Sequence, residues 1–217
     1  EFLIALGIVA GLFVIIGVCL PGERHISESI ETNRKMTIVY DTVNSLRRFK
    51  DWNPLVLRDP AIKLSLSGPD SGVGARLDYQ SEERGIGAGS WTLAESEKNK
   101  RIAFDLETVD PGRNKRMEFL LEPTGRNNRN VQITQTFDVE YGYDLLGRYA
   151  GLYITDNVGE DMKLGLGKFS NLIATIPRFD YSQHDAEFAY VDLPAQNVLS
   201  ATATAKRAND DIAVAMT

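Results

Sequence analysis

The chain has 217 residues, a formal net charge of −6, one cysteine and two histidines. The acidic balance argues against a nucleic-acid binder, which would normally present a basic face. A single cysteine excludes an intrachain disulfide framework or a cysteine metal cluster, and two distant histidines argue against a histidine site. We therefore expect no metal, no cofactor and no nucleic-acid partner. The length suits one domain of about 150 residues with additional segments.

The N-terminal stretch from Phe2 to Leu20 contains no charged residue and is rich in Leu, Ile, Val and Phe. At ~1.5 Å per residue, a helix of this length spans about 30 Å, the hydrocarbon thickness of a bilayer. A cleaved signal peptide is the alternative, but it would end in small residues, whereas this stretch ends in Val18-Cys19-Leu20-Pro21. We predict a transmembrane helix over residues 1–21.

This helix predicts a single-pass protein of the inner (cytoplasmic) membrane, with its soluble domain on the periplasmic or other extracytoplasmic side. The flank after the helix carries charges of both signs, among them Glu23, Arg24, Arg34 and Lys35. The positive-inside rule therefore does not decide the side.

Residues 22–178 are expected to form one α+β domain. From His25 to Thr32 the residues alternate, with Ile26, Glu28 and Ile30 on one face of a strand. Helical spacing follows from Met36 to Leu46, and Trp52-Asn53-Pro54 ends that helix. Further alternation predicts strands over 62–66, 75–79, 91–93, 102–106, 117–121 and 131–141.

The last part of this domain is expected to be a long helix. Its apolar stripe comprises Val158, Met162, Leu166, Phe169, Ile173 and Ile176. Pro177 follows, where a helix does not easily continue. Gly165 and Gly167 each cost about 1 kcal/mol of helix stability relative to Ala, which suggests a close approach to the backbone. We predict a strongly curved antiparallel sheet of six or seven strands wrapped around this helix, with a cavity between them.

Several stretches, in this order, resemble the helix-grip fold of the START-like (SRPBCC) superfamily. The resemblance rests on Ser29-Ile30-Glu31-Thr32-Asn33 with Val39-Tyr40, on Trp52-Asn53-Pro54, on Gly72-Val73-Gly74-Ala75, and on Leu146-Gly147-Arg148-Tyr149 with Gly159 to Leu166. The last stretch and Leu20-Pro21 are similar to membrane-anchored bacterial members labelled polyketide cyclase/dehydratase. The resemblance implies a hydrophobic ligand cavity. It carries over no catalytic residue, because no catalytic signature defines the family.

Beyond the helix, residues 179–187 are expected to be a polar linker. Residues 188–217 begin with Phe188-Ala189-Tyr190-Val191, which suggests a new strand, and Asp210 to Met216 suggests the start of a helix. This segment is similar to the opening of a gyrase-inhibitor-like effector-binding domain, of which only the start is present.

Three groups of residues are candidates for ligand contact. Inward-facing aromatic and sulfur side chains are one group, for which plain core packing is the alternative: Tyr79, Trp91, Phe104, Phe119, Phe137, Met162 and Phe169. Tyrosines crowded where the sheet meets the helix form a second group, a possible pocket rim: Tyr141, Tyr149 and Tyr153. The third group is polar and lies on the inward face, where Glu28 and Gln135 each need a partner.

The leading hypothesis is a membrane-anchored binding protein that holds a hydrophobic small molecule or lipid. An enzyme similar to a polyketide cyclase or dehydratase is the first alternative, with Glu28 or tyrosines as acid–base groups. A sensor or interaction protein acting through the C-terminal segment is the second alternative.

Overall fold

The computed structural model describes residues 2–177, apart from the side chain of Thr155. The expected linker and incomplete second domain lie outside the described residues and stay predictions. Helix α1 (Phe2–Cys19) is long and apolar enough to cross a membrane, although by length and composition a signal sequence fits equally. It is followed at once by strand β1 (Glu23–Thr32).

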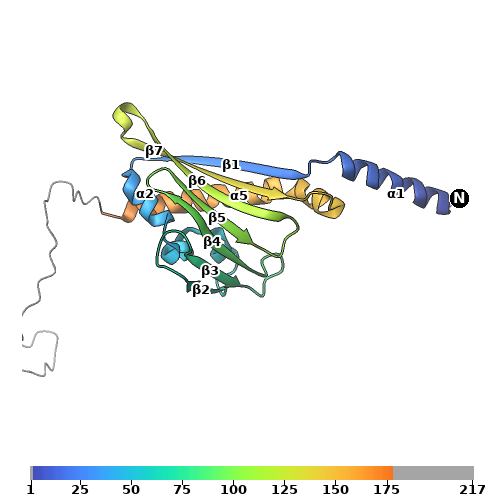
Figure 1. Ribbon diagram of the computed structural model, residues 1–217, viewed down its shortest axis with the longest axis horizontal. Helices are drawn as coiled ribbons and strands as arrows, with labels where there is room; N and C mark the ends of the chain where they lie inside the picture. Colours follow the sequence, from blue (N-terminus) through green and yellow to red (C-terminus); the bar gives the residue numbers. More distant parts are fainter. Residues whose placement is uncertain (1, 178–217) are drawn as a thin grey trace, which may run out of the picture. The chain divides into compact units, whose positions relative to one another are not determined.

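Seven strands form one antiparallel sheet in the order β1-β7-β6-β5-β4-β3-β2 (Figure 1). The remaining strands are β2 (Lys63–Ser67), β3 (Arg76–Gln80), β4 (Ala88–Glu97), β5 (Arg101–Glu107), β6 (Arg113–Thr124) and β7 (Asn130–Glu140). Strands β2 to β7 follow one another as hairpins. The last of them, β7, pairs with the first strand of the chain, β1, along the whole length of β1. The alternation in the sequence arises because one face of this sheet is buried and the other faces water.

Four short helical segments connect β1 to β2. They are α2 (Met36–Val43), the 3₁₀ turn η1 (Leu46–Arg48), α3 (Phe49–Trp52) and α4 (Pro54–Arg58). The sequence predicts one helix that stops at Trp52-Asn53-Pro54, but this motif instead restarts the helical path. The Asn53 side chain accepts a hydrogen bond from the Leu55 backbone N–H at 3.0 Å, and Pro54 occupies the first helical position. Both are favoured at a helix N-terminus, so α4 begins there.

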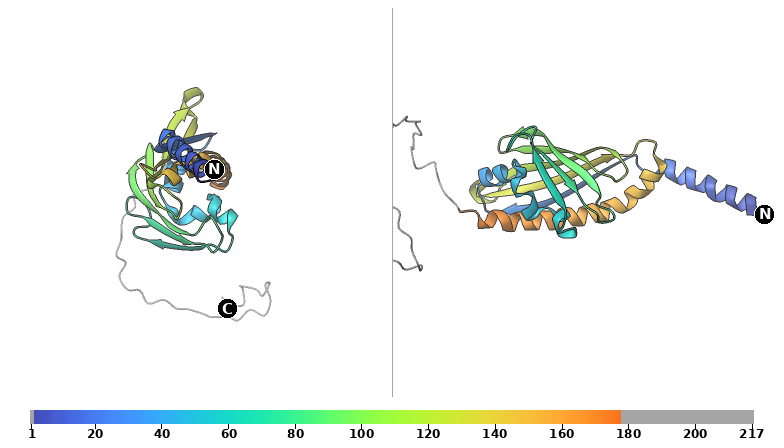
Figure 2. Two further views of the ribbon diagram at one scale, coloured as in Figure 1. Left: turned by 90° about the vertical axis from the view of Figure 1, so that its right-hand side faces the viewer. Right: turned by 90° about the horizontal axis from the view of Figure 1, so that it is seen from below.

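Helix α5 (Leu145–Thr175) lies in the concave face of the sheet, which curls around it (Figure 2). The helix-grip fold expected from the sequence is thereby confirmed. The helix begins well before Val158, where the apolar stripe predicts its start. Asp144 caps it by accepting a hydrogen bond from the Gly147 backbone N–H at 3.0 Å.

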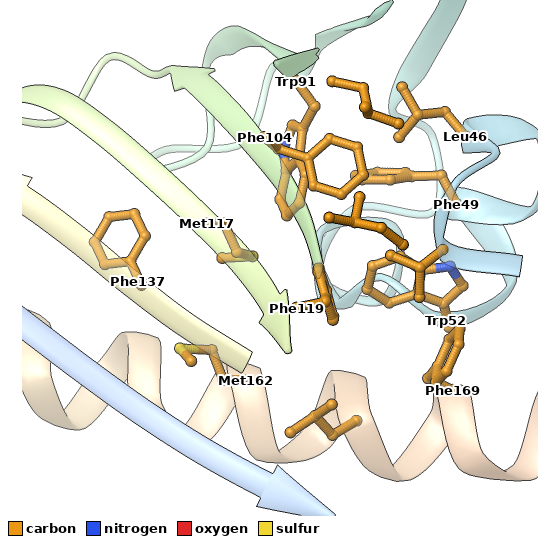
Figure 3. Packing of buried hydrophobic residues seen from close by; sticks show 14 of the residues in the cluster. Leu46, Phe49, Trp52, Trp91, Phe104, Met117, Phe119, Phe137, Met162 and Phe169 are labelled. Carbon is orange, nitrogen blue, oxygen red and sulfur yellow. The ribbon is translucent and has the colours of Figure 1, made fainter. Parts of the chain in front are cut away.

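An aromatic cluster fills one half of the space between the sheet and α5 (Figure 3). It comprises Phe49, Trp52, Trp91, Phe104, Phe119 and Phe169, whose rings meet edge to face at centroid distances of 5.2 to 6.2 Å. Such contacts add about 0.5–1.5 kcal/mol each beyond the burial of area. Trp52 contacts three other rings of this cluster, those of Phe49, Phe119 and Phe169.

Candidate functional site

A cavity of about 530 Å³ occupies the other half of the interior, between the sheet, α4 and α5. We call it the interior cavity. The sheet contributes Tyr79, Trp91, Met117, Gln135 and Phe137, and α5 contributes Met162 among others. Its volume falls within the range of ligand pockets, ~300–1,000 Å³, and its lining combines apolar and aromatic side chains with polar and charged ones. This combination suits a small molecule with a hydrophobic body.

The rim of the interior cavity is more polar than its wall. Arg58 of α4 donates a hydrogen bond to Asp161 of α5 at 3.0 Å. The loop between β3 and β4 contributes Gly85 and Ile86. The glycine-rich stretch that begins there connects the hairpin strands β3 and β4. The Ile86 side chain of this loop is buried and forms part of the cavity lining.

Lys115 is the cation in the wall of the interior cavity, and only 6% of its surface is exposed. Its Nζ donates to Thr108 Oγ1 at 2.8 Å and to the Asp110 carbonyl oxygen at 2.5 Å. Burial lowers the pKa of Lys115, and the negative charge of Asp110 partly opposes that shift. All its hydrogen-bond partners among residues 2–177 are neutral groups, so no carboxylate among them pairs directly with its positive charge.

Sequence reasoning missed Lys115, although a signal was present. It lies two residues before Met117 on β6, and residues two apart on a strand share a face. A lysine in phase with the inward residues Met117 and Phe119 needs buried partners, and the loop after β5 provides them.

Gln135 lies at the centre of the sheet's inner face, paired with Glu28 of β1 and Phe119 of β6. It is 4% exposed, and its Nε2 lies 2.8 Å from the sulfur of Met117. Its Oε1 has no hydrogen-bond partner among residues 2–177. Reversing the amide would merely place the NH₂ group there instead. An unmet buried polar atom is costly, and this one belongs to a residue in the wall of the cavity.

Tyr79 reaches the cavity from β3 by crossing Gly89, its direct partner on β4. A Cβ at Gly89 would lie 2.4 Å from the Tyr79 hydroxyl oxygen and 2.2 Å from the Glu107 carbonyl oxygen, so a side chain there is excluded. Burial, followed by the nearby charge of Asp110, raises the pKa of Tyr79 to about 12. The phenol is therefore neutral at physiological pH and retains its proton as a donor.

Of the residues expected to contact a ligand, five line the interior cavity: Tyr79, Trp91, Gln135, Phe137 and Met162. Phe104, Phe119 and Phe169 are buried instead within the aromatic cluster. Alternation places all of them inward correctly. It does not tell which part of the interior is filled and which is hollow.

Glu28 does not line the interior cavity. Its side chain is a quarter exposed and lies 3.4 Å from the Lys163 Nζ of α5. The alternation that places Glu28 inward holds, but β1 is an edge strand, and water and a lysine reach the carboxylate there. Catalysis by Glu28 in the cavity has no support from this geometry.

The three tyrosines expected at the rim also lie away from the cavity. Tyr141 packs beneath Gly147 and Gly151, where a Cβ would come within 2.8 and 2.9 Å of its ring. Tyr149 points to α1, and Tyr153 is 73% exposed. Their crowding in the sequence arises from the early start of α5 rather than from a pocket.

The two glycines of α5 differ in their surroundings. A Cβ at Gly165 would lie 3.2 Å from Cδ of Pro54, and Gly165 also borders the cavity. A Cβ at Gly167 would meet nothing within 4 Å. The close approach expected from the glycines thus occurs at Gly165, where α4 crosses α5.

Two further hollows, of about 560 and 970 Å³, lie along strand edges and loops, and their linings are mainly charged and polar. They lack the aromatic wall of the interior cavity. Within residues 2–177, no three His, Cys, Asp or Glu side chains are grouped so that they could hold a metal ion.

Neither a protein-family model nor a curated protein matches this sequence. Solved structures do share its fold. Norcoclaurine synthase from Thalictrum flavum, in complex with dopamine and hydroxybenzaldehyde, has a TM-score of 0.53 at 18% identity, covering 74% of this chain and 91% of that one. A protein from Nitrosospira multiformis has a TM-score of 0.52 at 14% identity, covering 70% of this chain and 97% of that one.

At these identities the likeness shows the fold alone. The shared fold agrees with the arrangement of a curved antiparallel sheet around a long C-terminal helix seen in this structure.

Proposed function

We propose that this protein binds a hydrophobic small molecule or lipid in its interior cavity while α1 anchors it in a membrane. The observation that carries the proposal is the half-hollow interior itself. A domain of this size normally fills its core to crystal-like density, yet here about 530 Å³ stays open beside a fully packed aromatic cluster. Norcoclaurine synthase, which has the same fold, is described with two aromatic small molecules bound.

The chemistry of the wall narrows the ligand class. Phe137, Met162 and Trp91 would surround the body of the ligand, so we expect that body to be apolar. The unmet amide position of Gln135 and the charge of Lys115 favour a ligand with at least one hydrogen-bonding group, such as a hydroxyl or carbonyl oxygen. A purely aliphatic molecule would leave the Gln135 position unsatisfied.

The membrane anchor fits this ligand class. The side chains of α1 are exposed along nearly its whole length, so the rest of residues 2–177 leaves most of α1 uncovered. A tethered binding protein meets a ligand that partitions into the bilayer at a high local concentration. The expected inner-membrane, extracytoplasmic placement belongs to this proposal.

The proposal is tested on protein extracted in mild detergent, with bound molecules released by organic solvent and identified by mass spectrometry. Binding of the apolar fluorophore N-phenyl-1-naphthylamine is measured in parallel. We expect a reproducible apolar species and saturable fluorophore binding that the Gly165→Leu variant loses. The proposal would be overturned if the wild-type protein carried no bound molecule and also did not bind the fluorophore.

A further inference from the structure

Helix α1 is held to the first turns of α5 by specific contacts. The Arg148 guanidinium Nη1 donates to the carbonyl oxygens of Val18 at 2.9 Å and Leu20 at 3.0 Å. Val18 belongs to the last turn of α1 and Leu20 follows its end, where carbonyls have no helical partner and carry the negative end of the helix dipole. Arg148 thus both caps α1 and ties it to α5.

Tyr149 makes a second contact, deeper along α1. Its hydroxyl donates to the Phe13 carbonyl oxygen at 2.7 Å, and the two rings stack at a centroid distance of 4.4 Å. Gly17 makes room for this approach, since a Cβ there would lie 3.1 Å from the Tyr149 ring. The start of α5 therefore lies alongside the last turns of α1 rather than beyond its end.

The length of α1 fixes the depth of this contact in a bilayer. Its 18 residues extend about 27 Å, slightly less than a typical hydrocarbon thickness of ~30 Å. A helix of this length that spans the bilayer therefore lies wholly within the hydrocarbon region. Phe13 lies six residues before Cys19, which is about 9 Å along the helix axis. A side chain that stacks on Phe13 must itself reach the hydrocarbon edge.

The start of α5 has the composition that such a position requires. Leu146, Tyr149 and Tyr153 recur at helical spacing and form one stripe. Leu146 is 72% exposed and Tyr153 is 73% exposed. The charged residues between 143 and 153 are Asp144 and Arg148, and both are engaged in hydrogen bonds at helix ends. Tyrosine is enriched at membrane interfaces because its ring is apolar and its hydroxyl is polar.

We infer that residues 143–153, at the start of α5, form an interfacial helix segment that docks the domain onto the same bilayer that α1 spans. The inference rests on the proposed membrane anchor and adds a second, separate membrane contact. The occupant of the exposed Leu146–Tyr153 stripe is the lipid headgroup and upper acyl region. Continuity with the apolar surface of α1, through the Phe13–Tyr149 stack, selects lipid over a protein partner.

This docking brings the interior cavity close to the membrane surface. Ile154, Asn157 and Val158 line the cavity on α5, and Asn157 follows Tyr153 by about one helical turn, or ~6 Å. A molecule leaving the bilayer at the docked segment would meet the cavity without crossing bulk water. The orientation of the domain, and not only its tether, then serves ligand exchange.

The test places an environment-sensitive fluorophore on single cysteines in the Cys19→Ser background, with the full chain in phosphatidylcholine nanodiscs. Labels at Leu146→Cys and Tyr153→Cys report docking, and Val9→Cys reports the anchor. Leu164→Cys is the matched control, because Leu164 is an exposed leucine farther along the same helix. Quenching is measured with doxyl lipids from the bilayer and with iodide from water.

We expect labels at 146 and 153 to be quenched by shallow doxyl lipids and protected from iodide several-fold relative to the label at 164. The label at 9 should be quenched by deep doxyl lipids. Docking is overturned, with the anchor intact, if 146 and 153 match 164 while 9 is quenched. If 9 is also unquenched, both the anchor and the docking are wrong, and ligand binding by the cavity is judged separately.

Discussion

The two halves of the interior have the same sheet above and the same helix below, yet they differ in what lies between. Toward the C-terminal end of α5, Phe169 is fully buried against Trp52 within the aromatic cluster. Toward its middle, Met162 and Phe137 border the interior cavity. The short helices after β1 contribute Phe49 and Trp52 to the aromatic cluster, whereas α4 borders the cavity.

This contrast separates stability from function along one helix. Closely packed rings supply dispersion and burial, which stabilise the fold whether or not a ligand is present. The hollow half lacks these contacts. Its wall instead contains a buried amide without a full set of hydrogen bonds, at Gln135, and a buried cation, Lys115. Substitutions in the two halves should therefore differ in kind as well as in size.

The largest effect is expected for Phe169→Ala in the filled half. Loss of a fully buried ring should lower the free energy of unfolding by about 3–5 kcal/mol. Phe137→Ala removes the same group from the wall of the cavity, where one side of the ring borders open space, and should cost less than Phe169→Ala. Urea denaturation of the domain measures both. Equal losses in the two variants would show that the cavity is filled or collapsed in solution.

Gly165→Leu should have the next largest effect, on binding. Its side chain would push against Pro54 and enter the cavity, so N-phenyl-1-naphthylamine should bind at least tenfold more weakly, equivalent to about 1.4 kcal/mol. Gly167→Leu is the control, because Gly167 lies two residues farther along the helix, where a Cβ meets open space. It should leave binding unchanged and slightly stabilise the helix. Loss of binding in both variants would point to a distorted helix rather than a filled cavity.

The sequence predicts the sheet and the second half of α5 well because burial on one face imposes a strict period on the residues. The apolar stripe does not extend to the first half of α5, because Leu146, Tyr149 and Tyr153 there face α1 and the surroundings instead of the sheet. The sequence also does not predict where the aromatic cluster ends and the cavity begins. This boundary depends on how Trp52 enters the interior from a segment between β1 and β2, and no local pattern encodes that position.

Lys115 gives a smaller effect, which appears in the pH dependence of stability. Burial lowers its pKa in the folded protein, so the unfolded chain binds the proton more tightly. The free energy of unfolding should then rise with pH as the pH increases through the lowered pKa toward the ordinary value of 10.5. Lys115→Met should remove that rise. Urea denaturation between pH 8 and 10 measures it, and an identical slope in both proteins would contradict the assignment.

Tyr79 should give the smallest and most local signal. Its pKa is raised to about 12 by burial in the hollow half, whereas an exposed tyrosine ionises near 10. Since the folded pKa is the higher one, its contribution to stability is complete below pH 10 and is lost as the pH rises toward 12. An absorbance titration at 295 nm should show a late step that Tyr79→Phe removes. If Tyr79 titrated with the exposed tyrosines, water would already fill the cavity around its hydroxyl, and the hollow half would be a wet cleft rather than a site prepared for an apolar ligand.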